Sequence, residues 1–419
     1  MKKTAFVLLC LLGGLVSLYA QHDSRADILS DIERAGGVHY LYPTDQPRPT
    51  AAPKGYKPFY VSHLGRHGAR YALGNTVYTD LWNIWSRAHE KAWLTPEGEA
   101  FYQAYAALYP LIRQREGNLT AKGQEQLRYI ARSLYRNYPR LFKGATHASA
   151  VSTGSHRVIV SMYSLLNELD RLDKDFTFDA DYGYPYQGYL LPEIIDRPTP
   201  LPDSVVRKEQ DFYRRMVPQQ QMLSRWFTRP DSVVANPQRF LGDLHTVVST
   251  LDNLDTEVAP ELYAVFTPQE RYGLWASNNY NGYVWMGPCP DVENVRPAAM
   301  QALLQDIIGK AQEDIASGKV QLRLRFSHDS ALLPLLSLMD VNGMGTRTSD
   351  PERVGDSWRT FDVPMACNLQ LVFFRRGRTS SDILVQVLLN GREATLPLSM
   401  AAPGSFYRWT DFVLRYSRP

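Results

Sequence analysis

Two arginines and a histidine stand within five residues of one another, in the segment Arg66-His67-Gly68-Ala69-Arg70. Two guanidinium groups can bind an oxyanion through paired hydrogen bonds, and a neutral imidazole can act as a covalent nucleophile near neutral pH. The glycine lets the backbone come close to a ligand. The segment is therefore typical of a site that holds a phosphoryl group and attacks it, although these residues alone also fit a solvated turn.

Two later segments supply the residues that would complete such a site. Arg157 follows the small residues Ser152-Thr153-Gly154, and His328 is followed directly by Asp329. Hydrolysis of a phosphomonoester requires bound phosphoryl oxygens, a nucleophile in line with the leaving oxygen, and a proton for that oxygen. We expect His67 to attack, and Asp329 to protonate the leaving oxygen and then deprotonate the attacking water. The expected phosphate-binding residues are Arg66, Arg70, Arg157 and His328. This chemistry requires no metal and no cofactor.

Each of the three segments comes directly after a predicted β-strand. The strands are expected at residues 59–64, 145–151 and 321–326, where apolar residues are concentrated or alternate with polar ones. Helical patterns lie between them, and Asn390-Gly391 predicts a hairpin near the C-terminus. This order indicates an α/β fold with a mixed, mostly parallel sheet flanked by helices. Ligands bind at the carboxyl ends of strands in such sheets, so the three segments can converge.

The chain is predicted to contain a signal peptide, a core in two pieces and an insertion. Residues 1–20 combine a positive start with a short apolar run and a small residue, as signal peptides do. Residues 21–174 and 291–419 are expected to form the α/β catalytic core. Residues 175–290 are richer in Pro, Tyr, Gln and Asp and are expected to form a mostly helical cap.

The charge balance argues against a nucleic-acid-binding protein. Removal of residues 1–20 leaves 44 basic and 43 acidic residues, so the expected mature chain is almost neutral. No later stretch is long and apolar enough for a stable transmembrane span. We expect an exported protein, periplasmic or secreted, whose partner is a small anionic phosphate ester. Membrane association, the oligomeric state and pairing of Cys289 with Cys367 stay open.

Taken together, these motifs resemble the histidine phosphatases, in particular the larger branch that contains acid phosphatases, phytases and multiple inositol polyphosphate phosphatases. Besides the segments above, Gly117-Asn118-Leu119-Thr120 with Gly123 is similar to the family segment G-x-L-T-x-x-G. The resemblance covers nearly the whole expected mature chain. It implies a phosphoglycerate mutase-like core with a helical cap, and hydrolysis in two steps through phosphorylated His67.

The sequence departs from the family pattern at two places. Arg70 is followed by Tyr71-Ala72, where the larger branch usually has a proline two residues after the arginine. His328-Asp329-Ser330 stands where the inositol polyphosphate phosphatases typically have His-Ala-Glu. The proton donor is thus placed as in acid phosphatases and phytases, while the apolar residues around it look closest to the inositol polyphosphate subgroup.

Three functions therefore stay in consideration. The first is hydrolysis of inositol polyphosphates such as phytate, the second is a broad-specificity histidine acid phosphatase, and the third is a phospholigand-binding protein without catalysis. Highly phosphorylated substrates need extra cations, and the candidates in the expected cap are Arg207, Lys208, Arg214 and Arg215, which could equally lie on the outside. A zinc site at His63 and His67 is disfavoured, because they lie on a strand and a turn without an acidic cluster.

Overall fold

A computed structural model gives the fold and describes residues 23–192, 200–292 and 295–417. The described residues form an eight-stranded sheet in the order β3-β2-β4-β1-β5-β6-β7, with β8 paired to β6. Neighbours among β3, β2, β4 and β1 are parallel, and the other pairs are antiparallel. The strands are β1 (Lys57–Arg66), β2 (Thr146–Ser152), β3 (Phe176–Tyr182), β4 (Leu322–Ser327), β5 (Asn368–Arg375), β6 (Ile383–Leu389), β7 (Arg392–Glu393) and β8 (Phe406–Arg408). The predicted mixed sheet with a mostly parallel core is confirmed.

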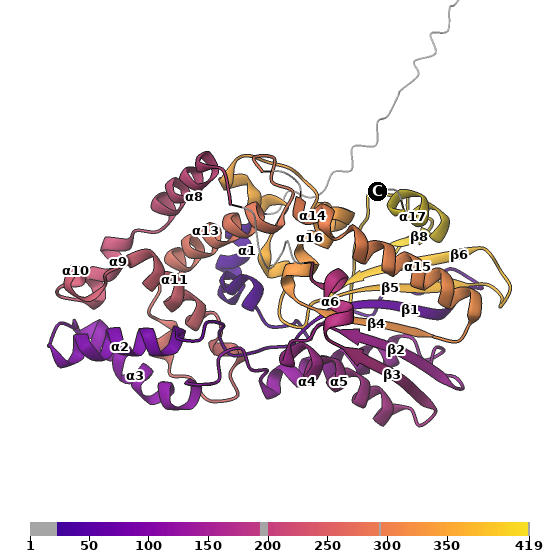
Figure 1. Ribbon diagram of the computed structural model, residues 1–419, viewed down its shortest axis with the longest axis horizontal. Helices are drawn as coiled ribbons and strands as arrows, with labels where there is room; N and C mark the ends of the chain where they lie inside the picture. Colours follow the sequence, from indigo (N-terminus) through magenta and orange to yellow (C-terminus); the bar gives the residue numbers. More distant parts are fainter. Residues whose placement is uncertain (1–22, 193–199, 293–294, 418–419) are drawn as a thin grey trace, which may run out of the picture.

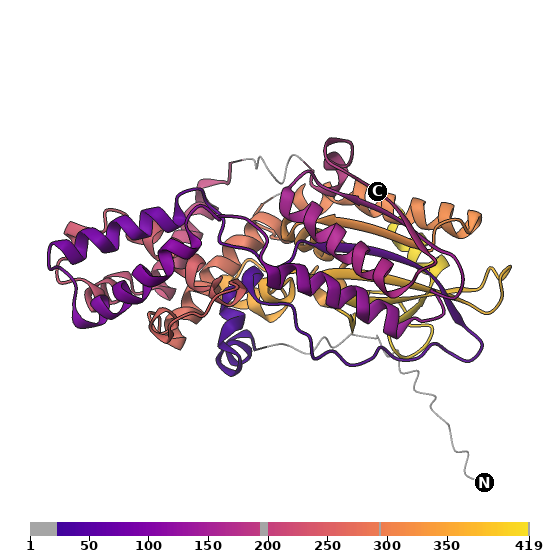
Figure 2. The ribbon, with the colours of Figure 1, turned by 90° about the horizontal axis from the view of Figure 1, so that it is seen from below.

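Helices cover both faces of the sheet (Figure 1, Figure 2). Because side chains alternate along a strand, Val61 of β1 packs in the apolar cluster of α4 and α5, whereas Tyr60 and Leu64 pack in the cluster of α15, α16 and α17. The helices of the sheet layers are α4 (Ala121–Asn137), α5 (His156–Leu172), α6 (Tyr184–Leu190), α14 (Val295–Ala299), α15 (Gln301–Ser317), α16 (Asp329–Met339) and α17 (Trp409–Tyr416).

A helical part with its own aromatic core adjoins the sheet layers, on the left in Figure 1. Its helices are α2 (Val77–Glu90), α3 (Pro96–Ile112), α9 (Gln219–Trp226), α10 (Pro230–Val233), α11 (Pro237–Val248) and α12 (Pro260–Tyr263). Two further helices, α8 (Asp203–Met216) and α13 (Pro268–Met286), bury residues both in this core and in that of the sheet layers. Trp85 of α2 lies against Phe101 of α3, Trp226 of α9 and Phe240 of α11, with ring centroids 4.5, 6.1 and 6.1 Å away.

These packing relations correct the predicted extent of the insertion. β3 pairs in parallel with β2, so the sheet continues past the predicted boundary at residue 174. α2 and α3 precede that boundary, yet they share a core with α9 and α11, so the helical part draws on two separate stretches of the chain. Amphipathic periodicity identifies a helix but does not tell which core it joins, which is why the sequence placed α2 and α3 with the sheet. The division into domains otherwise stays a prediction.

Capping residues begin several helices, and a two-residue turn forms the predicted hairpin. Thr95 and Thr120 cap α3 and α4, each accepting a hydrogen bond from the backbone three residues ahead. Thr267 and Glu270 form a capping box at the start of α13. Asn390 and Gly391 have φ of 52° and 75°, as the predicted two-residue hairpin turn requires. The strand after this turn ends at Glu393, and the Leu396 N–H donates to the Tyr407 hydroxyl at 2.9 Å.

The remaining described elements are short. They are α1 (Ser24–Ser30) and the 3-10 helices η1 (Ile32–His39), η2 (Leu251–Asn253), η3 (Val341–Gly343), η4 (Pro351–Asp356) and η5 (Thr360–Asp362). None of the described helices is both long and apolar enough to span a bilayer. The predicted signal peptide, residues 1–20, lies outside the described residues. Cys289 and Cys367 are both buried and are not joined to each other.

Candidate functional site

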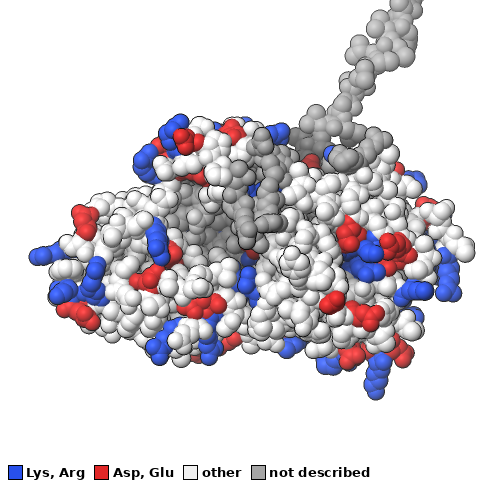
Figure 3. Space-filling model, in the orientation of Figure 1, with Lys and Arg blue, Asp and Glu red and all other residues white. Residues whose placement is uncertain are grey.

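Three neighbouring parallel strands bring the sequence-predicted residues to one edge of the sheet. Arg66 at the end of β1 is in register with Ser327 at the end of β4, and Ser152 at the end of β2 is in register with Phe326. His67 and His328 follow directly, and their ring centroids lie 5.6 Å apart. Arg157 stands in the first turn of α5, and its Nη2 is 3.5 Å from Nδ1 of His328. This edge faces the helical part, and the surface is hollowed where the two parts meet (Figure 3).

Three arginines at this edge have buried guanidinium nitrogens without a hydrogen-bond partner. These are Nε and Nη2 of Arg66, Nε of Arg70 and Nε of Arg157. Leaving such donors unpaired is costly unless an acceptor arrives from outside the protein. Arg66 is nevertheless fixed in place, because its Nη1 donates to the carbonyl oxygens of Val38 and Val363. The three guanidiniums therefore form a preorganised cationic edge suited to an oxyanion.

The hydrogen bond of His67 defines which ring nitrogen is free. Nδ1 lies 2.9 Å from the Gly68 carbonyl oxygen. A carbonyl oxygen only accepts, so Nδ1 carries the proton and Nε2 keeps its lone pair. Burial, together with Arg66 and Arg70, holds the pKa of His67 well below its usual value. The imidazole is therefore neutral at physiological pH, which is the form that can act as a nucleophile.

His328 is bonded in the opposite sense. Its Nδ1 faces the Arg157 guanidinium and accepts, while its Nε2 lies 3.2 Å from the Thr153 hydroxyl and 3.4 Å from that of Ser155. Burial and the charge of Arg157 lower its pKa to about 4. In this arrangement Nδ1 has no proton to donate. The phosphate-binding role predicted for His328 therefore requires protonation of Nδ1, which the negative charge of a bound phosphate would favour.

Asp329 is the first residue of α16, directly after His328 as its N-cap. Its Oδ1 lies 3.3 Å from Nη2 of Arg66, and its side chain is 23% exposed. Burial would raise the pKa of Asp329, but Arg66 and Arg70 outweigh burial and hold it at about 2. The carboxylate is therefore ionised in the free site. It is also open enough to meet a ligand held by the arginines.

Searches by sequence and by structure give different results. No protein-family model matches the chain, and no curated protein sequence matches it. Among solved structures, the multiple inositol polyphosphate phosphatase of Bifidobacterium longum in complex with inositol hexasulfate superposes with a TM-score of 0.71 at 16% identity, over 90% of this chain and 96% of that one. The phytase from D. castellii gives a TM-score of 0.66 at 14% identity, over 92% and 84%. The Hafnia alvei phytase gives 0.53 at 12%, over 87% and 98%.

The chain has the fold of the phytase-type histidine phosphatases. The fold implied by the sequence motifs is thereby confirmed. Identities of this size carry the fold and no more, so the roles of individual residues depend on the geometry of this chain.

In this phytase-type fold the loop that follows His67 is clamped between α4 and α5. The Gly68 N–H donates to the Ser161 hydroxyl of α5 at 3.0 Å, and the Ala69 N–H donates to Oε1 of Gln126 on α4 at 2.8 Å. A Cβ on Gly68 would lie 2.2 Å from the carbonyl oxygen of Gly123. The close approach thus explains why both Gly68 and Gly123 are glycines.

Gly68→Ala will therefore displace the loop from α4. We expect loss of most phosphatase activity and about 1–3 kcal/mol of the free energy of unfolding, as in other overpacked sites. Steady-state kinetics and denaturant unfolding measure the two effects. Gly309→Ala is the matched control, because a Cβ there meets nothing within 4 Å and Gly309 lies inside α15. Wild-type kinetics in Gly68→Ala would show that the loop tolerates separation from α4.

A loop of the helical part also holds the site in place. The Asp255 carboxylate accepts from the N–H groups of Ala121 and Lys122, at 2.7 and 3.0 Å, and so caps α4. Nδ2 of Asn253 lies 3.4 Å from the carbonyl oxygen of Arg70. The loop that carries Asn253 and Asp255 therefore contacts both Arg70 and α4, the helix against which the loop after His67 packs.

The four cations proposed for polyphosphate recognition are mostly paired with carboxylates. Lys208 pairs with Asp291, Arg214 pairs with Asp211 of its own helix, and Arg215 lies 3.5 Å from Glu352. Arg207 is exposed. The structure therefore does not bring these residues together as a cationic cluster, which sequence position alone could not reveal.

Several residues of the site were not expected from the sequence. Thr153, Gln126 and Ser161 position the expected residues through the hydrogen bonds above. Thr153 lies inside a recognised segment, and Gln126 and Ser161 lie one helical turn after recognised segments. His39, at the end of η1, interacts electrostatically with Arg70, Arg66 and Asp329, although it lies far from any recognised motif. Within the described ranges, no three His, Cys, Asp or Glu residues gather as metal ligands.

Buried neutral histidines predict a loss of stability in acid. Burial lowers the pKa of His63 to about 3, with Arg325 adding to the effect, and lowers that of His245 to about 4. Their folded pKa values lie below those of the unfolded chain, so unfolding takes up protons and stability falls as the pH drops below about 6.5. The slope is about 1.4 kcal/mol per pH unit for each histidine. Urea unfolding at pH 7 and at pH 5 measures this change in the free energy of unfolding.

His63→Phe provides the control for this effect. Both ring nitrogens of His63 are buried without a partner, and the ring lies 5.4 Å from that of Phe326. The variant will keep the packing at this position. Because it lacks the imidazole, unfolding will take up one proton fewer, and its free energy of unfolding will depend less steeply on pH. An unchanged slope would show that His63 titrates alike in both states.

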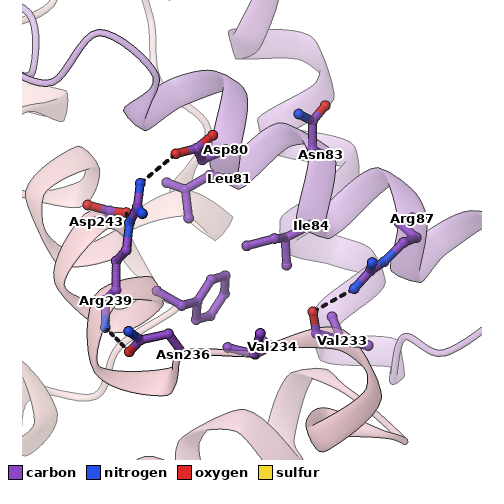
Figure 4. A pocket seen from close by; sticks show the side chains of 12 residues that line it. Asp80, Leu81, Asn83, Ile84, Arg87, Val233, Val234, Asn236, Arg239 and Asp243 are labelled. Atoms are coloured by element: carbon purple, nitrogen blue, oxygen red, sulfur yellow. Dashed lines mark hydrogen bonds and ion pairs between the residues drawn. The ribbon is translucent and has the colours of Figure 1, made fainter.

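A separate pocket of about 470 Å³ lies between α2 and α11, within the helical part (Figure 4). Leu81, Ile84 and Phe240 form its apolar lining. Its charged rim is already paired, since Arg239 lies 2.9 Å from Asp80 and Arg87 donates to the Val233 carbonyl. None of the predicted site residues lines this pocket.

Proposed function

We propose that the chain is a phosphomonoesterase that hydrolyses inositol polyphosphates such as phytate through a phosphohistidine on His67. The arginines hold the phosphoryl oxygens, and Nε2 of His67 attacks phosphorus while the bond to the ester oxygen breaks. Asp329, which is ionised in the free site, takes up the proton that a substrate monoanion brings and gives it to the departing oxygen. In the second step Asp329 takes a proton from water, the water oxygen bonds to phosphorus, the P–N bond breaks and phosphate leaves.

One observation carries this proposal. Buried guanidinium nitrogens of Arg66, Arg70 and Arg157 have no hydrogen-bond partner in the protein, and all three charges act on a neutral His67 with its Nε2 lone pair free. A pure binding protein needs the cations but neither a free nucleophile nor a carboxylate beside it. The geometry therefore supports catalysis over a phospholigand-binding protein.

The comparisons support the choice of substrate class. The Bifidobacterium longum enzyme was solved both with inositol hexasulfate and with phosphate, and the neighbours at TM-scores of 0.66 and 0.53 are phytases. We propose the same class of substrate here. With the signal peptide expected at residues 1–20, the proposed place of action is the periplasm or the exterior.

The broad-specificity acid phosphatase is the second candidate. The lack of a cationic cluster at Lys208, Arg214 and Arg215 favours it, because each of these residues faces its own carboxylate. A smaller phosphate ester needs only the arginine edge itself.

Comparing phytate with a simple aryl phosphate decides between the two. We expect release of phosphate from phytate, with a restricted set of product isomers, because several phosphates must be placed at once. The measurement is kcat/KM for both substrates, with isomers resolved by ion-exchange chromatography. Fast turnover of the aryl ester with negligible attack on phytate would favour the acid phosphatase and contradict the inositol polyphosphate proposal.

A further inference from the structure

His39 is an imidazole at the candidate site with no role in the steps above. It is the last residue of η1 and is half-buried. The element lies where the helical part and the sheet part meet, since Gly36 approaches Ser249 beside the end of α11 and Gly37 approaches Thr360 of η5. His39 therefore belongs to the junction above the arginine edge.

Hydrogen bonds fix the backbone on both sides of His39. The Val38 carbonyl accepts from Nη1 of Arg66, and the Tyr40 carbonyl accepts from the Met365 N–H at 2.8 Å. The next residue along, Ala366, donates its N–H to the His67 carbonyl at 2.9 Å. The position of His39 is thus tied directly to Arg66 and, through the 365–366 backbone, to the nucleophile.

The charges around His39 place it on the side of the proton donor. Arg70, Arg66, Asp329 and His245 are the charged and titratable groups that act on it most strongly after burial. The influence is mutual, because His39 also acts on Asp329. The geometry agrees, because the carbonyl of the preceding residue, Val38, contacts Arg66, and Nη2 of Arg66 lies 3.3 Å from the Asp329 carboxylate. His39 therefore stands next to the pair of residues that must face the departing oxygen.

We propose that His39 is a specificity-determining residue that contacts the leaving group and donates a hydrogen bond to a phosphate next to the one under attack. The inference rests on the proposed function, since it requires a substrate with neighbouring phosphates. A simple aryl phosphate carries no such group. His39 therefore contributes to recognition of the polyphosphate and not to the chemical steps.

The test compares His39→Leu and His39→Asn with the wild type on phytate and on an aryl phosphate. For His39→Leu we expect kcat/KM on phytate to fall about tenfold or more, mainly through KM, as for loss of a hydrogen bond to a charged group. The aryl ester should change by less than about threefold. Asn keeps an N–H donor and should recover part of the loss, and the product isomers should shift in both variants.

His147→Leu is the matched control, because His147 lies on β2 and bonds to Thr177 and Asp179, away from the site. Equal losses on both substrates would overturn the inference, since they would indicate that His39 only positions Arg66 or Asp329. Unchanged kinetics on phytate would overturn it as well. If the wild type itself does not hydrolyse phytate, the proposed function fails first and the inference fails with it.

Discussion

Replacing His67 with alanine will abolish turnover and leave a site that still binds inorganic phosphate. Nε2 of His67 keeps a free lone pair, whereas Nδ1 of His328 faces Arg157. Loss of the nucleophile should lower kcat by a factor on the order of 10⁴ or more. The guanidinium nitrogens of Arg66, Arg70 and Arg157 are unaffected, so the anion keeps its donors.

Two measurements separate the nucleophile from the phosphate grip. Acid-stopped reactions with ³²P-labelled substrate should leave label on the wild-type protein and none on His67→Ala, while calorimetry with inorganic phosphate should detect binding to both. Circular dichroism checks folding, and His147→Ala controls for the loss of an imidazole elsewhere. Retained turnover in His67→Ala would rule out the phosphohistidine pathway. Loss of phosphate binding in a folded variant would show that the imidazole itself holds the anion.

The sequence could predict the convergence of the site because the rule behind it is local. Each candidate site segment follows an apolar stretch, and the carboxyl ends of parallel neighbours must meet at one edge. Arg66 in register with Ser327 and Ser152 in register with Phe326 confirm this reasoning. The predicted residues come together because strand order places β1, β4 and β2 side by side.

Features that depend on contacts between distant segments could not be predicted. The Val38 carbonyl, next to His39, reaches Arg66 only because η1 docks at the junction of the two parts, and no spacing in the sequence encodes that docking. The free nitrogen of His67 depends on the orientation of one carbonyl, that of Gly68. The composite helical part arises because Trp85 and Trp226 pack together across more than a hundred residues of chain. The apolar periodicity of the sequence carries no information on the docking of η1, on the orientation of that carbonyl or on the packing of these tryptophans.

Asp329→Asn will slow hydrolysis most for esters with poor leaving groups. An amide cannot protonate an alkoxide, so we expect a loss of about 10²–10⁴-fold in kcat/KM on phytate or a sugar phosphate. A nitrophenolate departs without help, so formation of the phosphohistidine from a nitrophenyl ester should be nearly unaffected. Its breakdown will be slow, because the same residue activates water. Stopped-flow kinetics should therefore show a burst of nitrophenol whose molar amount equals that of the enzyme, followed by slow turnover.

The pKa of Asp329 also predicts the pH dependence of the wild type. Because Arg66 and Arg70 hold that pKa at about 2, the free carboxylate carries no proton at working pH. The proton must then arrive with a substrate monoanion and pass to Asp329 as the phosphoryl charge offsets the arginines. Since phosphate esters lose their second proton near pH 6, kcat/KM should fall as the pH rises above about 6.

A rescue experiment tests whether the carboxylate or its position matters. Asp329→Ala combined with Ser330→Glu restores the His-Ala-Glu order of the inositol polyphosphate phosphatases, with the longer acid one residue later along the first turn of α16. Recovery of activity on alkyl phosphates would show that a carboxylate at this helix start suffices. An equal loss for alkyl and aryl esters in Asp329→Asn, without a burst, would instead contradict the acid–base role. Such a result would indicate that Asp329 acts only through its ion pair with Arg66.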